Sequence, residues 1–208
     1  EFKFIKKIKE PGSPAMDRGK DMHKLCEEYI RGRFDELPKE LKEFEEAFVK
    51  LKELHELGQV TCESDWAITK EWDQTGWFDN DTWGRAKVDA FVYDEGNSTE
   101  ARVIDFKTGR YEGNQEAHKE QCELYGGIAL KRYPELEKII TEMWYLDHGK
   151  IDRYIYTQES INIKRDKIHI RAVEMTEATE FPAKPSKWKC KWCYFGKQNM
   201  CREKYEEY

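Results

Sequence analysis

Apolar residues recur at helical spacing in the first part of the chain. Residues 15–32 are predicted to form a helix entered through Pro14, because proline is well placed in a first helical turn. A second helix, rich in Lys and Glu, is predicted over residues 38–57, where one face carries Leu41, Phe44, Phe48, Leu51 and Leu54. The pattern therefore predicts a helical N-terminal portion over residues 1–58.

The pattern changes to that of β-strands after residue 59. Strands are predicted over residues 60–72, 84–93 and 101–107, with a loop or hairpin tip rich in Asp, Asn and Gly at 72–83. Residues 94–98 read Asp-Glu-Gly-Asn-Ser, which is typical of a hairpin turn. Antiparallel pairing of the second and third strands would bring Asp89 toward Asp105.

Helices and strands then alternate to the end of the core. A helix is predicted over residues 118–130, two strands over 138–147 and 151–156, and a final helix over 161–179. These elements indicate an α/β fold with a mixed central sheet flanked by helices. We expect a single domain over residues 1–208, made of the helical portion at 1–58, a core at 59–180 and a cysteine-bearing tail at 181–208.

Composition and charge limit the classes of function. Charged and hydrophobic residues each make up 38% of the chain, but seven Trp, eleven Tyr and ten Phe supply the apolar surface of a packed core. The net charge of −6 argues against indiscriminate binding along duplex DNA, which depends on neutralising phosphates. A local basic groove remains compatible with it, with candidate residues Arg85, Lys87, Lys107, Arg110, Lys119 and the stretch 184–197. The aromatic residues Trp188, Trp192, Tyr194 and Phe195 in that stretch would shield a metal site, which we favour, or stack bases.

Asp105 and Lys107 are the strongest chemical signal. They are two residues apart on a predicted strand, so their side chains point to the same face, next to Asp89 on the neighbouring strand. Two carboxylates and a lysine suit a hard divalent cation such as Mg²⁺, and Lys107 would orient or deprotonate a water. The alternative is an exposed ion pair on a surface hairpin. We read Glu63, in the preceding strand, as a solvated residue, with an extra acidic neighbour of the site as the less favoured alternative.

Two predicted helices add polar residues to this set. Gln121 and Tyr125 share a face of the helix after the hairpin by their i, i+4 spacing, and so do His23 and Glu27 near the N-terminus. The ordered set His23, Asp89, Asp105-x-Lys107 and Gln121-x-x-x-Tyr125 resembles the PD-(D/E)XK nuclease superfamily in its RecB-like branch. That branch includes the nuclease domains of RecB and AddB, CRISPR-associated RecB-like nucleases and phage exonucleases.

The resemblance implies a restriction-endonuclease-like fold and a nuclease that hydrolyses phosphodiester bonds in DNA with Mg²⁺ or Mn²⁺. Asp89, Asp105 and the backbone carbonyl of Phe106 would hold the cation, and His23 would complete the site or hold a second ion. Lys107 would hold the attacking water or stabilise the charge of the transition state. Gln121 and Tyr125 would position the DNA strand or the lysine, or else simply pack the helix on the sheet.

Three of the six cysteines lie close together in the tail: Cys190, Cys193 and Cys201. Thiolates at this spacing are typical of metal or cluster ligation. The resemblance implies a [4Fe-4S] cluster with a fourth cysteine near the N-terminus, and Zn²⁺ or three uncoordinated thiols are the alternatives. We expect the fourth ligand among native residues missing from the front of the chain, with Cys26 as the fallback.

The resemblance also indicates the kind of DNA substrate and the biological setting. We expect an exonuclease acting on single strands or DNA ends in recombination, repair or replication, as in phages, with a helicase or recombination partner. A CRISPR spacer-processing nuclease and a non-catalytic DNA-binding or scaffold subunit are the alternatives. Clustered cysteines, and a sequence without a recognisable signal or membrane span, predict an intracellular, cytoplasmic protein that a phage could encode in a bacterial host.

Overall fold

The computed structural model describes residue 3 and residues 5–203 of the chain. The chain divides into two compact units. Residues 14–170 form the larger one, which we call the sheet unit, and residues 1–13 with 171–208 form the smaller one, the terminal unit. The prediction of one domain over the whole chain stays a prediction.

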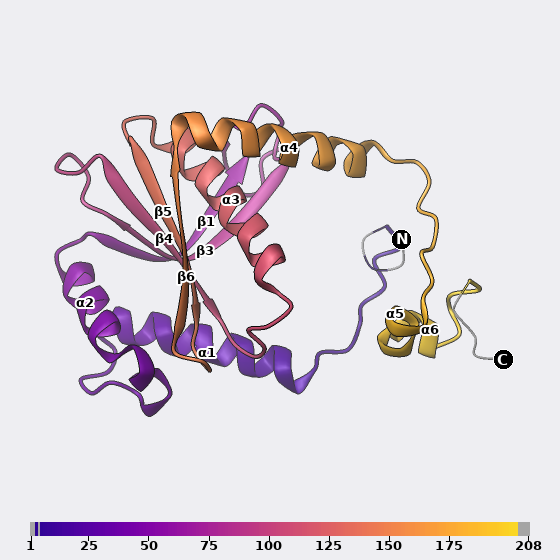
Figure 1. The fold of residues 1–208 in the computed structure, drawn as a ribbon, viewed down its shortest axis with the longest axis horizontal. Helices are drawn as coiled ribbons and strands as arrows, with labels where there is room; N and C mark the ends of the chain where they lie inside the picture. Colours follow the sequence, from indigo (N-terminus) through magenta and orange to yellow (C-terminus); the bar gives the residue numbers. More distant parts are fainter. Residues whose placement is uncertain (1–2, 4, 204–208) are drawn as a thin grey trace. The chain divides into compact units, whose positions relative to one another are not determined.

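The sheet unit is built on a six-stranded mixed sheet with the order β2-β1-β3-β4-β5-β6 (Figure 1). Every neighbouring pair is antiparallel except β4 and β5, which run parallel. The predicted mixed α/β architecture is therefore confirmed. The strand bounds are Val60–Ile68 for β1, Gln74–Thr75 for β2, Gly84–Tyr93 for β3, Glu100–Lys107 for β4, Lys138–Tyr145 for β5 and Lys150–Thr157 for β6.

Helices cover both faces of this sheet, and each face has its own core. Helix α1 (Pro14–Ile30) and helix α2 (Glu45–Glu56) pack on one face, over a cluster that includes Ile104 and Phe106 of β4. Helix α3 (Gln115–Arg132) and the start of α4 (Gln158–Glu177) pack on the other, over a cluster that includes Val103. Alternate residues of β4 thus enter opposite cores, as the pleat of a strand requires.

Two predicted elements end differently from the prediction. The single helix predicted over 38–57 is wrong, because the chain forms a 3-10 helix, η1 (Lys39–Phe44), before α2 begins. Residues three apart line up on a 3-10 helix, which lets Leu41 and Phe44 bury together, with Phe44 stacked on Trp144 at 5.3 Å between ring centroids. The strand predicted to reach Trp72 ends at Ile68, and Trp72 turns its ring into the core with a positive φ of 69°.

The terminal unit contains two short helices, α5 (Lys187–Trp192) and α6 (Tyr194–Lys197). The hydroxyl of Ser186 caps α5 by accepting a hydrogen bond from the backbone N–H of Lys189. No helix in the part of the chain that the structure describes combines the length and the apolar character that a membrane span needs.

Candidate active site

The site forms where β3 and β4 separate. The last pair of the β3–β4 ladder is Ala90 with Ile104, and the next position on each strand is an aspartate, Asp89 and Asp105. Beyond this pair a side chain replaces the backbone as acceptor: Asp89 Oδ2 accepts a hydrogen bond from the backbone N–H of Phe106 at 2.7 Å. The sequence prediction that Asp89 and Asp105 approach one another agrees with this register.

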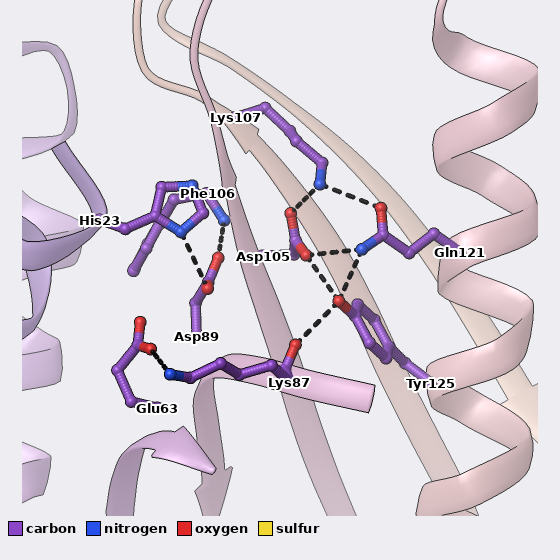
Figure 2. A network of polar contacts seen from close by, with 9 residues as sticks. All are labelled: His23, Glu63, Lys87, Asp89, Asp105, Phe106, Lys107, Gln121 and Tyr125. Carbon is purple, nitrogen blue, oxygen red and sulfur yellow. Dashed lines mark hydrogen bonds and ion pairs between the residues drawn. The ribbon is translucent and has the colours of Figure 1, made fainter. Parts of the chain in front are cut away.

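His23 reaches Asp89 from helix α1 (Figure 2). Its Nδ1 lies 3.0 Å from Asp89 Oδ1, and its side chain is about one-third exposed. Arg18 of the same helix binds Asp147, just after β5, through its guanidinium. Asp147 also accepts a hydrogen bond from the backbone N–H of Gly109 at 2.7 Å. The hydrogen bond from Arg18 lowers the pKa of Asp147, so this ion pair stays formed at neutral pH.

Helix α3 completes the other side of the site. Lys107 Nζ lies 2.5 Å from Asp105 Oδ2 and donates to Gln121 Oε1 at 3.0 Å. Gln121 Nε2 and the Tyr125 hydroxyl both bond Asp105 Oδ1, at 3.0 and 2.8 Å. The same hydroxyl also lies 3.0 Å from the carbonyl of Lys87, so an acceptor on β4 and one on β3 are both within reach of its single proton. Figure 2 shows these side chains converging from β3, β4 and α3.

Burial makes the site electrostatically unusual. Asp89 and Asp105 are 7% and 3% exposed. Burial raises the pKa of Asp89, and the neighbouring charge of Asp105 adds to the effect, while the hydrogen bond from His23 opposes it. Burial lowers the pKa of His23, but the hydrogen bond and charge of Asp89 outweigh this and raise it overall. Two buried carboxylates with few balancing cations are an environment in which a bound cation is stabilising.

Glu63 lies next to these residues, which agrees with the acidic neighbour that the sequence offered as the less favoured interpretation. Its side chain is only 21% exposed and forms a 2.9 Å ion pair with Lys87. Cys62 and Ser64 pair with β3 on either side, whereas Glu63 itself adopts φ 55° in the middle of β1. That left-handed conformation is uncommon for a residue other than glycine. No local feature of the sequence marks the position, because Glu63 faces Asp89 only through the register of β1 on β3.

The donor set fits a hard divalent cation. Among the described residues, one group of His, Cys, Asp or Glu offers ligand atoms that all lie within 4.8 Å of one another, and it consists of His23, Glu63 and Asp89. Carboxylate oxygens with one imidazole are ligands that suit Mg²⁺ or Mn²⁺, whereas soft metals prefer thiolates. Phe106 is 1% exposed with its ring in the core, so its role as a ligand through the backbone carbonyl stays a prediction.

An open cleft of about 860 Å³ leads to these residues. Of the predicted basic groove, Arg85, Lys87 and Lys107 line the cleft, joined by Lys20 and Lys24 of α1, which the sequence prediction missed. Arg110 instead lines a separate cleft with His148 and Lys150. Lys119 is half-buried on α3 and lines neither of these two clefts.

The six cysteines fall into two groups. Cys26, Cys62 and Cys122 are buried in the sheet unit, where burial raises the pKa of Cys62 and of Cys122 to about 12 and that of Cys26 well above its usual value. Cys26 as the fourth cluster ligand stays a prediction. Cys190, Cys193 and Cys201 are half-buried and line one cleft of the terminal unit with Phe195.

A mixed sheet flanked by helices, with two carboxylates and a lysine at the ends of neighbouring strands, is consistent with the restriction-endonuclease-like class of nucleases. A family model described as the PD-(D/E)XK nuclease superfamily matches residues 2–202, and the chain belongs to that superfamily. Members of the superfamily use divalent metals and act on DNA, and the predicted family membership is confirmed.

A crystal structure described as a "putative exonuclease" from Eubacterium rectale is 13% identical, with a TM-score of 0.51, over 97% of this chain and 80% of that chain. This likeness supports the fold. The crystal structure of SSO0001 is 16% identical over 91% of this chain and 100% of that chain, with a TM-score of 0.35. No curated protein matches the chain.

Proposed function

We propose that this nuclease is a Mg²⁺- or Mn²⁺-dependent deoxyribonuclease of the RecB-like branch that degrades DNA from its ends. One observation carries the proposal: Lys107 is held between Asp105 and Gln121 at the edge of an open cleft, beside the His23–Glu63–Asp89 group. A cation held by Asp89 and Asp105, with His23 or Glu63, would polarise a phosphoryl oxygen and lower the pKa of water.

The chain's own residues supply positioning and charge. Lys107 has its ammonium fixed by two acceptors, so it is placed to orient a water or to stabilise the negative charge that develops on phosphorus. Gln121 and Tyr125 hold Asp105 Oδ1, which leaves Oδ2 and the ammonium facing one another. We therefore assign Gln121 and Tyr125 as positioning residues and Asp89, Asp105 and Lys107 as catalytic residues.

The decisive experiment measures cleavage of end-labelled linear DNA, single-stranded and duplex, with Mg²⁺ or Mn²⁺. Asp105→Asn and Lys107→Met should each lower the rate about 1,000-fold or more, which corresponds to about 4 kcal/mol of lost transition-state stabilisation. The exposed residues Asp166 and Lys167 on α4 provide matched controls, and Asp166→Asn and Lys167→Met should cut at the wild-type rate. Wild-type rates for both site variants would refute the mechanism.

Circular DNA separates end-directed from internal cleavage. An exonuclease should leave circular single strands and circular duplex intact while it degrades the same sequences after linearisation. Rapid cleavage of the circles would establish an endonuclease instead. Binding to both forms without any cleavage would favour a DNA-binding or scaffold subunit with this fold.

We further propose that Cys190, Cys193 and Cys201 hold an iron–sulfur cluster, with Zn²⁺ as the alternative metal. Their lining of one cleft supports this, as does the presence of residues 1–13 and the tail in one compact unit, because Ile5 and Lys6 line a cleft together with Cys201. A cluster at this place would connect both chain segments of the terminal unit. Visible absorbance and iron analysis of anaerobically purified protein would distinguish iron from zinc.

A further inference from the structure

A loop of the sheet unit displays an aromatic ring to solvent beside the active-site cleft. Residues 76–83 connect β2 to β3, and Phe78 at the tip of this loop is 87% exposed. Its neighbour Trp77 is half-buried. A single exposed apolar residue is common on protein surfaces. Phe78 differs from such a residue in its surroundings, which are a hydrogen-bonded loop and Arg85.

The loop is held in shape by its own polar residues. The backbone N–H of Gly76 donates to Asp79 Oδ2 at 2.8 Å, and the hydroxyl of Thr75 donates to Asp81 Oδ1 at 2.7 Å. The hydroxyl of Thr82 closes the loop by donating to the carbonyl of Gly76 at 2.7 Å. Phe78 is thus presented on a preorganised backbone, so a partner that stacks on it pays little for ordering the loop.

Arg85 joins the aromatic tip to the cleft. Its Nε donates to the carbonyl of Trp77 at 2.6 Å, and its guanidinium carbon lies 5.6 Å from the Trp77 ring centroid and 5.9 Å from that of Phe78. Arg85 also lines the cleft that contains Asp89 and Asp105. Arg85 therefore places a cation that can bind phosphate next to the rings of Trp77 and Phe78, whose faces suit a nucleobase.

The distance along β3 fits a DNA strand that passes from the tip to the catalytic residues. Arg85, Lys87 and Asp89 occupy alternate positions of β3 and all line the cleft. Four residues of strand span about 13 Å at about 3.3 Å per residue. At about 3.4 Å per nucleotide of a B-form strand, this is about four nucleotides, and fewer if the strand is extended.

We propose that Phe78, with Trp77 and Arg85, forms a stacking platform for an unpaired base of the DNA strand that enters the active site. Within a duplex the faces of a base are covered by its neighbours, so the platform selects single-stranded DNA or a frayed end. The inference rests on the proposed function for its substrate, and it concerns a position a few nucleotides from the bond that is cut.

Binding without metal tests the platform separately from catalysis. Anisotropy of a labelled single-stranded oligonucleotide, with a chelator present to prevent cleavage, gives the dissociation constant of the full chain. Phe78→Ala and Phe78→Leu should weaken binding about 5- to 150-fold, the range for loss of one base–aromatic stack. Phe78→Tyr, which keeps the ring, and Leu57→Ala, which removes another strongly exposed apolar side chain, should stay within about 2-fold of wild type.

An abasic site moved along the oligonucleotide shows whether a base is the partner. It should weaken binding to the wild-type chain at one or two positions and have no effect at those positions on Phe78→Ala. Equal losses for both proteins at every position would overturn the platform, as would unchanged affinity in Phe78→Ala. A change in oligomeric state for Phe78→Ala would also overturn it, because the ring would then serve a protein contact. Lack of metal-dependent cleavage would refute the proposed function while leaving these binding results interpretable.

Discussion

Glu63 combines an unfavourable backbone conformation with a position next to His23 and Asp89. The left-handed conformation costs about 1–2 kcal/mol for an ordinary L-residue, and here it occurs within a strand whose neighbours keep their ladder pairs. The conformation coincides with placing the carboxylate among His23 and Asp89. Residues held in such conformations are often found at functional positions, where the surrounding structure over-determines them.

We expect Glu63→Asn to separate stability from metal binding. Asparagine tolerates the left-handed region better than glutamate, so the free energy of unfolding should stay at the wild-type value or rise by up to about 1 kcal/mol. The shorter neutral side chain should weaken Mn²⁺ or Mg²⁺ binding, measured by calorimetry. Glu63→Gln keeps the length and the backbone preference, so it should weaken metal binding without stabilising the fold. Wild-type metal affinity in both variants would place Glu63 outside the metal site.

At the scale of elements, the close approach of α3 to the sheet positions Gln121 and Tyr125. Two consecutive glycines make this approach possible in the middle of the helix. A Cβ on Gly126 would come within 2.9 Å of the Tyr156 ring, and one on Gly127 within 3.0 Å of the Trp72 ring. Neither has a positive φ, so it is space rather than backbone freedom that requires glycine at these positions.

We expect Gly126→Ala to destabilise the protein by about 1–3 kcal/mol, because the cost of overpacking exceeds the better helix propensity of alanine. Chemical denaturation measures this change. Gly19 provides the opposite control within α1, since a Cβ there would meet its nearest atom at an ordinary 3.5 Å. Gly19→Ala should stabilise by about 0.5–1 kcal/mol. Equal effects of the two substitutions would show that α3 has room to shift.

For the whole molecule, the cysteines divide the chain by chemistry. The three thiols of the sheet unit are buried and protonated, whereas the three of the terminal unit are half-buried around one cleft. Among its described residues, the terminal unit has the last turns of α4 and the short helices α5 and α6, and one of its apolar side chains, Phe195, is buried. Small structures of this kind commonly depend on a metal or a cross-link.

Removal of one ligand should therefore destabilise the terminal unit. We expect Cys193→Ser to lose its visible absorbance and to melt about 2–8 °C lower, the shift expected for about 1–2 kcal/mol in a chain of this size. Cys122→Ala, in the core of the sheet unit, should keep its colour. A Cys193→Ser protein with wild-type colour and melting temperature would exclude a structural cluster at this residue.

The sequence by itself determined the parts of the site that follow local periodicity. Asp105 and Lys107 share a face because strands alternate, and Gln121 and Tyr125 share a face because helices repeat every 3.6 residues. Their contacts in the structure agree with that spacing. Most helices and strands could be read in the same way from the apolar pattern, but the short strand β2 and the 3-10 turn before α2 could not.

Only the tertiary structure decided which distant residues join this set. Glu63 enters through the register of β1 on β3, and Arg85 meets Trp77 and Phe78 through the path of a loop. The break of the predicted 38–57 helix at Phe44 follows from stacking on Trp144, which is a hundred residues away along the chain. Periodicity records which face a residue occupies, but strand register and long-range packing depend on the whole chain at once, so no local pattern contains them.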